Sequence, residues 1–143
     1  MNVAAILKTK GRAVETATAR APLNELASTL ATKKIGAVVV VNDQGRVAGI
    51  ISERDVVRLL AERGTDALTL PVGECMTRNV VTCSEASTIE ELMETMTQGR
   101  FRHLPVVEND TLVGIISIGD VVKYHIADMT LEVSAMRNYL ATG

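Results

Sequence analysis

The chain has 143 residues and a formal net charge of −2, which corresponds to about one compact domain without a basic excess. Sequence-independent binding to nucleic acid depends on clustered lysine and arginine, so this charge gives it no support. No apolar run approaches the roughly 18 residues that cross a bilayer, and the N-terminus lacks the pattern of a signal peptide. We therefore expect a cytoplasmic chain that binds neither nucleic acid nor a membrane.

The composition also restricts the core and the chemistry of the thiols. Hydrophobic residues make up 47% of the chain and aromatic residues only 2%, so small aliphatic side chains have to fill the core. The two cysteines, Cys75 and Cys83, have neither C-x-x-C nor metal-ligand spacing. We expect both to be reduced thiols.

The first half of the chain predicts a short helix followed by a β-α-β-β-α unit. Val3, Ile6 and Leu7 lie one helical turn apart ahead of a stop at Gly11. The run of β-branched residues that ends at Val41 suits a strand covered on both faces. In order, we predict a helix over residues 3–10, a strand over 14–16, a helix that begins at Pro22, strands over 36–41 and 46–51, and a helix that ends at Gly64.

The second half repeats this order after a linker over residues 65–73. Pro105 has no backbone N–H to give to a strand ladder, so we place it at a sheet edge or a bulge. In order, we predict a short helical turn over 72–76, a strand over 80–82, a helix capped by Ser87 or Thr88, strands over 102–107 and 112–116, and a closing helix.

The closing helix carries an apolar stripe that its own repeat does not need. The stripe consists of Val122, Ile126, Met129, Val133, Met136 and Leu140, with no glycine or proline between them. Such a stripe most commonly meets a second copy of the chain in a symmetric dimer. Folding back onto the same chain is the alternative, and the sequence leaves both open.

A phrase that occurs twice shows that the two halves are repeats. Residues 49–57 read GIISERDVV and residues 114–122 read GIISIGDVV, which are identical at seven of nine positions. Internal repetition of this kind fixes the architecture. Each copy places the end of a buried strand before Ser-x-x-Asp, which opens a helix as a variant of the capping box.

The Ser-x-x-Asp pair also has a chemical use. A hydroxyl and a carboxylate one turn apart converge at a helix N-terminus among unpaired backbone N–H groups, where a diol and an anion can both be accepted. A helix cap alone explains one copy. Two copies in matching surroundings favour a binding role, because a cap does not require the same flanking residues.

Together, these motifs resemble tandem CBS domains, the cystathionine-β-synthase-type regulatory module. The resemblance rests on the doubled Gly-Ile-Ile-Ser-x-x-Asp, the Val-x-Thr segments at 14–16 and 80–82, and Arg102-His103-Leu104-Pro105-Val106. It covers residues 1 to about 128 and is nearest to stand-alone bacterial proteins with one CBS pair and terminal helices. It implies an α/β fold of two β-α-β-β-α repeats, related by a pseudo-two-fold axis, whose three-stranded sheets face one another. The expected divisions are a first repeat with its N-terminal helix over 1–67, a second repeat over 68–128 and a helical extension over 129–143.

The resemblance further implies two clefts between the repeats that bind adenosine-containing ligands such as AMP, ATP, NAD(H) or S-adenosylmethionine. In that family the aspartate accepts hydrogen bonds from ribose hydroxyls, the hydroxyl residue lies near ribose or phosphate, and strand backbone contacts the adenine edge. The Asp55 cleft would contain Ser52, Arg54 and Asp55 with Val81, Thr82, Arg102, His103 and Pro105. The Asp120 cleft would contain Ser117, Gly119 and Asp120 with Thr16, Gly36, Ala37 and Val39.

Charge distinguishes the two predicted clefts. The Asp55 cleft gathers Arg54 and Arg102, and a forked guanidinium is well suited to phosphate. The Asp120 cleft has Gly119 where the other has Arg54. We therefore expect the Asp55 cleft to bind phosphorylated ligands more tightly. The sequence leaves the alternatives open: solvated arginines, a structural His103, and threonines in the Val-x-Thr segments that are favoured only by their β-branching.

These features predict a regulatory module that senses adenine nucleotides, with no required cofactor, as a homodimer that acts on an unknown effector protein. A ligand-independent dimerisation or docking module is the alternative. An enzyme is disfavoured, because the chain has only two histidines, His103 and His125, and no second acid beside either Asp55 or Asp120, so it offers no set of catalytic groups.

Overall fold

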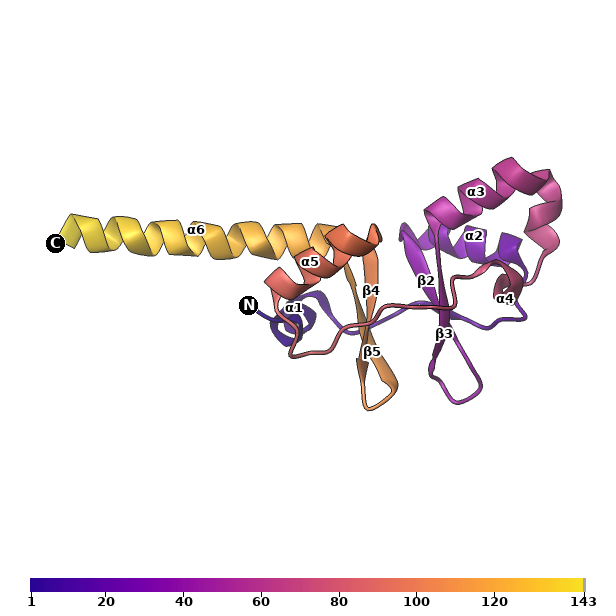
Figure 1. Cartoon of the computed structure of the whole chain (residues 1–143), viewed down its shortest axis with the longest axis horizontal. Helices are drawn as coiled ribbons and strands as arrows, with labels where there is room; N and C mark the ends of the chain where they lie inside the picture. The colour runs from indigo at the N-terminus through magenta and orange to yellow at the C-terminus, as the bar shows by residue number, and fades with distance from the viewer. Residues whose placement is uncertain (143) are drawn as a thin grey trace.

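Two lobes lie side by side in the computed structural model, which describes residues 1–142 (Figure 1). The elements are α1 (Val3–Lys10), β1 (Thr16–Ala17), α2 (Leu23–Lys33), β2 (Ala37–Val41), β3 (Val47–Ser52), α3 (Glu53–Arg63), the 3-10 helix η1 (Gly64–Thr69), α4 (Val72–Cys75), α5 (Ile89–Gly99), β4 (His103–Glu108), β5 (Thr111–Ser117) and α6 (Ile118–Thr142). Among these residues, no helix combines the length and the hydropathy that a membrane crossing requires.

The two β-hairpins have the same register, which confirms the repeat. In the first lobe Val38 pairs with Ile51, and in the second Leu104 pairs with Ile116. Each hairpin also has one register shift near its turn, between Val40 and Val41 in one and at the matching place in the other. The predicted α/β architecture of two related units is therefore confirmed.

The third strand differs between the repeats, and here the predictions for residues 14–16 and 80–82 are wrong in detail. In the first lobe the strand is Thr16–Ala17, which runs parallel to β2. In the second lobe residues 80–82 form no strand, and only Cys83 makes an isolated bridge to Val106. The second sheet is therefore two-stranded, not three-stranded as predicted.

Pro105 explains this shortened sheet. In the first lobe the N–H of Val39 donates to the carbonyl of Glu15, at 3.3 Å. The residue that matches Val39 is Pro105, which has no N–H to donate. Next to it the bonds resume, with Cys83 N to Pro105 O at 3.0 Å and Val107 N to Cys83 O at 2.9 Å. The predicted place of Pro105 at a sheet edge is confirmed.

The short helices α1 and α4 each cover the core of the other repeat. Val3, Ile6 and Leu7 of α1 pack into the second core with residues of α5, β4 and β5. Val72 and Cys75 of α4 pack into the first core with residues of α2, β2 and β3. Figure 1 shows α1 beside the second hairpin and α4 beside the first. The chain therefore crosses between the lobes twice, and the predicted division at residue 67 separates α1 from the core that it covers.

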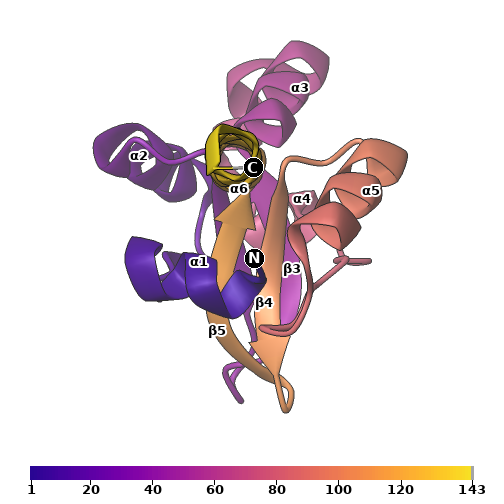
Figure 2. The ribbon, with the colours of Figure 1, turned by 90° about the vertical axis from the view of Figure 1, so that its left-hand side faces the viewer.

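The last helix, α6, leaves the body of the protein as a single rod of 25 residues (Figure 1). Val121 is buried against the second core, but the apolar stripe that follows is exposed, from 47% for Val133 to 72% for Leu140. Figure 2 looks nearly along this rod and shows it projecting from between the other helices. Within residues 1–142 it does not fold back onto its own chain.

Candidate functional site

Both Ser-x-x-Asp motifs form capping boxes at the starts of α3 and α6. In the first, Asp55 Oδ2 accepts from Ser52 N at 2.8 Å and from Ser52 Oγ at 3.1 Å, and Asp55 N donates to Ser52 Oγ at 3.4 Å. In the second, Asp120 Oδ2 accepts from Ser117 N at 2.9 Å and Ser117 Oγ at 3.0 Å. A carboxylate has about four acceptor positions, so the cap leaves room for further donors.

The Asp55 cleft is a cavity of about 320 Å³ whose walls come from both repeats. One wall is the end of β3 with the first turns of α3, and the other is the segment before β4 with the linker that follows α4. The lining residues are Gly36, Ala37, Ile50, Ser52, Glu53, Arg54, Asp55, Arg58, Thr77, Asn79, Val80, Val81, Arg100, Phe101, Arg102 and His103. Six of the eight residues predicted for this cleft are among them.

The Asp55 cleft is positively charged in a chain that is negative overall. Four arginines and two acidic residues line it, whereas the whole chain has a formal charge of −2. Within residues 1–142, the guanidinium groups of Arg54 and Arg102 form no hydrogen bond or ion pair, whereas Arg58 pairs with Asp55 at 3.1 Å. Arg54 also lies in the first turn of α3, where the helix dipole favours anions. The cleft therefore offers uncommitted donors to an anionic group.

Gly36 allows the walls of the cleft to approach closely. A Cβ at this position would lie 2.9 Å from His103 Cε1 and 3.1 Å from Glu53 Oε1. His103 is half-buried, and burial is the main cause that lowers its pKa, with nearby Lys10 adding to the effect. Glu53 and Asp120 oppose this shift without cancelling it. The imidazole is therefore neutral at pH 7.

His103 makes the stability of the fold sensitive to mild acid. Its pKa is lowered in the folded state, so the unfolded chain binds a proton first as the pH falls below about 6.5. The free energy of unfolding should therefore decrease between pH 7.5 and 5.5, by a fraction of the ~1.4 kcal/mol per pH unit that one proton can contribute. Urea titrations at both pH values should show a smaller decrease in His103→Gln than in the wild type or in the control His125→Gln. An equal decrease in all three proteins would contradict this.

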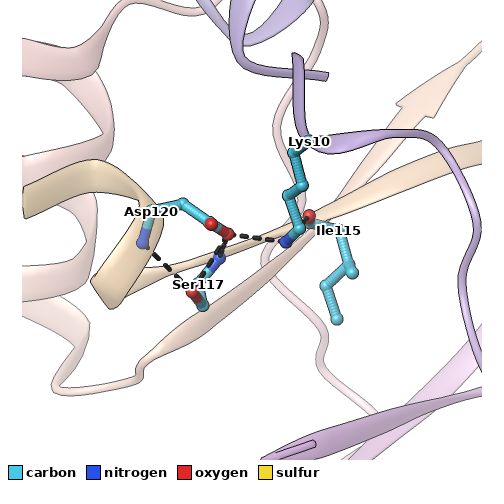
Figure 3. Close-up of polar contacts among 4 residues, drawn as sticks. All are labelled: Lys10, Ile115, Ser117 and Asp120. Atoms are coloured by element: carbon cyan, nitrogen blue, oxygen red, sulfur yellow. Dashed lines mark hydrogen bonds and ion pairs between the residues drawn. The ribbon is translucent and has the colours of Figure 1, made fainter. Parts of the chain in front are cut away.

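On the Asp120 side, a lysine from the N-terminal helix holds the carboxylate. Lys10 Nζ lies 2.6 Å from Asp120 Oδ2 and 2.8 Å from the carbonyl oxygen of Ile115 (Figure 3). Burial alone would raise the pKa of Asp120, but the hydrogen bonds from Lys10 and Ser117 outweigh it and lower the pKa. The carboxylate is therefore ionised and already paired with a cation.

The other residues predicted for the Asp120 cleft line other cavities or are buried. Gly36 and Ala37 line the Asp55 cleft, Val39 is completely buried, and Thr16 lines a separate cavity of about 250 Å³ beside α2. Of those assigned to the Asp55 cleft, Pro105 is buried within β4 and Thr82 lies outside the lining. Which of the predicted residues contact a ligand stays a prediction.

Sequence reasoning missed several residues of these sites. Arg58 could have been found, because it lies one helical turn after Asp55. Arg100 could also have been noticed beside Arg102. Lys10 carried no signal, since it meets Asp120 only through the fold, 110 residues along the chain.

Comparisons with known proteins agree with this geometry. The family model described as "CBS domain" matches residues 9–62 and 72–127. The crystal structure of the CBS-domain containing protein ATU1752 from Agrobacterium tumefaciens is 50% identical, with a TM-score of 0.85 over 87% of this chain and 99% of that chain. The CBS domain protein PAE2072 from Pyrobaculum aerophilum, solved in complex with AMP, is 27% identical, with a TM-score of 0.75 over 84% of this chain and 89% of the other.

A third solved structure holds different adenosyl compounds. It is the CBS domain pair of protein MJ0100 in complex with 5′-methylthioadenosine and S-adenosyl-L-methionine, 26% identical, with a TM-score of 0.80 over 90% of this chain and 98% of that chain. The chain spans 59%, 34% and 36% of the length of three curated relatives. The matched repeats and the shared fold show that this chain belongs to the CBS domain family, as a tandem pair.

Proposed function

We propose that this chain is a regulatory module that binds a phosphorylated adenosine compound, of the AMP, ATP or NAD type, in the Asp55 cleft. The observation that carries the proposal is the pairing of a helix-start carboxylate with uncommitted guanidinium groups in one cavity between the repeats. In this proposal the carboxylate of Asp55 accepts from the ribose diol, and Arg54 and Arg102 donate to the phosphate. The complexes of PAE2072 with AMP and of MJ0100 with adenosyl compounds support this choice of ligand.

The size of the cleft favours a mononucleotide. Ligand pockets commonly measure roughly 300 to 1,000 Å³, and the Asp55 cleft, at about 320 Å³, is at the small end of that range. AMP is therefore the first compound to test. A non-catalytic role in the cytoplasm is part of the proposal, and turnover of AMP, ATP or NAD by the purified chain would contradict it.

The direct test is titration calorimetry with AMP, accompanied by a thermal-shift screen of AMP, ADP, ATP, NAD, NADH and S-adenosylmethionine. A ligand that binds only the folded state must raise the melting temperature. We expect AMP to raise it and adenosine to raise it less, because adenosine lacks the phosphate. If no compound changes the melting temperature at millimolar concentration, the nucleotide proposal is wrong and the ligand-independent interaction module takes its place.

We also propose that the module is a homodimer joined by a parallel coiled coil of two α6 helices. The exposed stripe of α6 follows the alternating steps of four and three residues that define a heptad repeat. The a positions are Ile126, Val133 and Leu140, and the d positions are Val122, Met129 and Met136. β-Branched residues at a, here Ile126 and Val133, are typical of parallel two-helix coiled coils, in which leucine commonly fills d; in α6 valine and methionine take the d positions.

Charges beside the stripe support the parallel orientation. Glu132 falls at a g position and Arg137 at the e position five residues later. In a parallel pair, each glutamate of one copy faces the arginine of the other, which is the usual interhelical ion pair at these positions. An antiparallel pair would not bring g and e positions together.

The proposed dimer predicts a sharp difference between two neighbouring substitutions. Val133→Asp places a charge in the seam and should give a monomer in light scattering after size exclusion at about 50 µM. Leu131→Asp, at a more exposed apolar residue outside the stripe, should leave the dimer intact. A monomeric wild type, or dimers in both variants, would contradict the coiled coil.

A further inference from the structure

We propose that Lys10 occupies the Asp120 cleft as an internal cation, so that each chain binds one nucleotide and not two. The inference rests on the proposed function, because it concerns the second of the two related clefts. Lys10 Nζ donates to Asp120 Oδ2 and to the carbonyl oxygen of Ile115, which are the acidic and the strand-backbone acceptors on that side (Figure 3). A ribose diol and an adenine amino group are also donors, so they would compete with an ammonium group for these atoms.

The matching positions of the first repeat lack such a cation. Ahead of the hairpin turns the two repeats are offset by 66 residues, as Val14-x-Thr16 and Val80-x-Thr82 show, so Lys10 corresponds to Met76 and Gly11 to Thr77. Met76 packs against the first core, and the Ile50 carbonyl, which matches that of Ile115, accepts from the Thr77 backbone N–H at 2.9 Å. The first repeat thus has the apolar Met76 at the position where the second lobe receives the charged Lys10.

The cation that does reach Asp55 is held differently. Arg58 comes from the same helix, its side chain is 55% exposed, and it also lies 3.9 Å from Glu62. It can therefore turn towards solvent or towards a ligand phosphate while remaining on the lining of the cleft. Lys10 is only 30% exposed, whereas the two carboxylates are similarly shielded, at 19% for Asp120 and 14% for Asp55, so the difference between the ion pairs lies in the cation.

Packing of α1 holds Lys10 in this place. The helix is anchored by three fully or nearly fully buried residues, Val3, Ile6 and Leu7. Leu7 lies directly on the backbone of β5, because a Cβ at Gly114 would be 2.8 Å from Leu7 Cδ2. Lys10 is the last residue of α1, and the chain leaves it through Gly11 at φ +103°. The lysine is thus supplied by a docked helix and not by a free terminus.

The test is the number of AMP molecules bound per chain, measured by equilibrium dialysis and titration calorimetry. The wild type should bind one. Lys10→Met, which gives the second repeat the residue found in the first, should bind two. The matched control Lys8→Met removes the same charge from an exposed position of the same helix and should still bind one.

A further variant separates this inference from the proposed function. Lys10→Met combined with Asp55→Asn should keep the new site beside Asp120, while AMP binding in the Asp55 cleft weakens about tenfold to a hundredfold. Two AMP molecules on the wild type, or one on a folded Lys10→Met, would overturn the inference while leaving the Asp55 cleft in place. If the wild type binds no AMP, the proposed function fails. In that case, one AMP bound by Lys10→Met would still support the inference about Lys10. No AMP bound by Lys10→Met would overturn the inference as well.

Discussion

Asp55→Asn is expected to weaken AMP binding about tenfold to a hundredfold. A hydrogen bond to a charged group contributes about 1.5–3 kcal/mol, and each 1.4 kcal/mol is a factor of about ten in the dissociation constant. Asparagine keeps an oxygen that can accept from Ser52 N, so the start of α3 should persist. Titration calorimetry measures the affinity, and the melting temperature of the free protein shows whether the fold is intact.

The matched control is Asp120→Asn, the same change in the same motif of the other repeat. Because Asp120 is already paired with Lys10, we expect AMP affinity to change by no more than about twofold. A larger loss from Asp120→Asn than from Asp55→Asn would reverse the ranking of the two clefts.

Replacing both Arg54 and Arg102 with glutamine is expected to remove most of the preference for AMP over adenosine. Both arginines are exposed in the free protein, so we expect about a tenfold loss of AMP affinity from each, less than a fully buried pair would give. Adenosine should lose no more than about threefold, because it has no phosphate to lose. Calorimetric titrations with both ligands measure this discrimination.

Arg20→Gln combined with Arg46→Gln provides a control of equal charge. Neither residue lines the Asp55 cleft, so AMP affinity should be nearly unchanged at physiological ionic strength. Equal losses for AMP and adenosine in the cleft variant would indicate damage to the fold and would contradict a phosphate role for these arginines. The salt dependence of AMP binding should also be weaker in that variant.

The features that the sequence predicted correctly are local ones. The β-branched run of β2 and the Ser-x-x-Asp caps depend on neighbours within a few residues. Because the chain is a repeat, each of these patterns occurs twice, which strengthens its prediction. The charge of the Asp55 cleft could also be predicted, since Arg54 is part of the repeated phrase and Arg102 comes directly before β4. Both arginines line the cleft.

The features that were missed depend on contacts between distant residues. The missing third strand of the second sheet follows from one absent N–H at Pro105, whose consequence appears only when Val39 is seen bonded to Glu15. The apolar stripe of α1 predicts a buried face but does not specify which of two similar cores it covers. The contact between Lys10 and Asp120 could not be predicted for the same reason. Only when α1 packs on the second lobe does the ammonium group of Lys10 reach Asp120.

Within the Asp55 cleft, a backbone bond links the lining to the proposed dimer helix. Ile118, the first residue of α6, donates its N–H to the carbonyl of Arg102 at 2.8 Å. Arg102, which we propose binds the phosphate, is therefore hydrogen-bonded directly to the first residue of α6, the helix that we propose joins two copies. This places the ligand and the dimer interface on connected elements.

The crystal structure of the wild-type chain grown with saturating AMP tests the central claim most directly. The account predicts one AMP per chain in the Asp55 cleft, with the ribose hydroxyls within hydrogen-bond distance of Asp55 and the phosphate against Arg54 and Arg102. The contact between Lys10 and Asp120 should persist in the same crystal. Electron density for AMP beside Asp120 alone, or none in the Asp55 cleft of crystals grown at saturating concentration, would contradict the account.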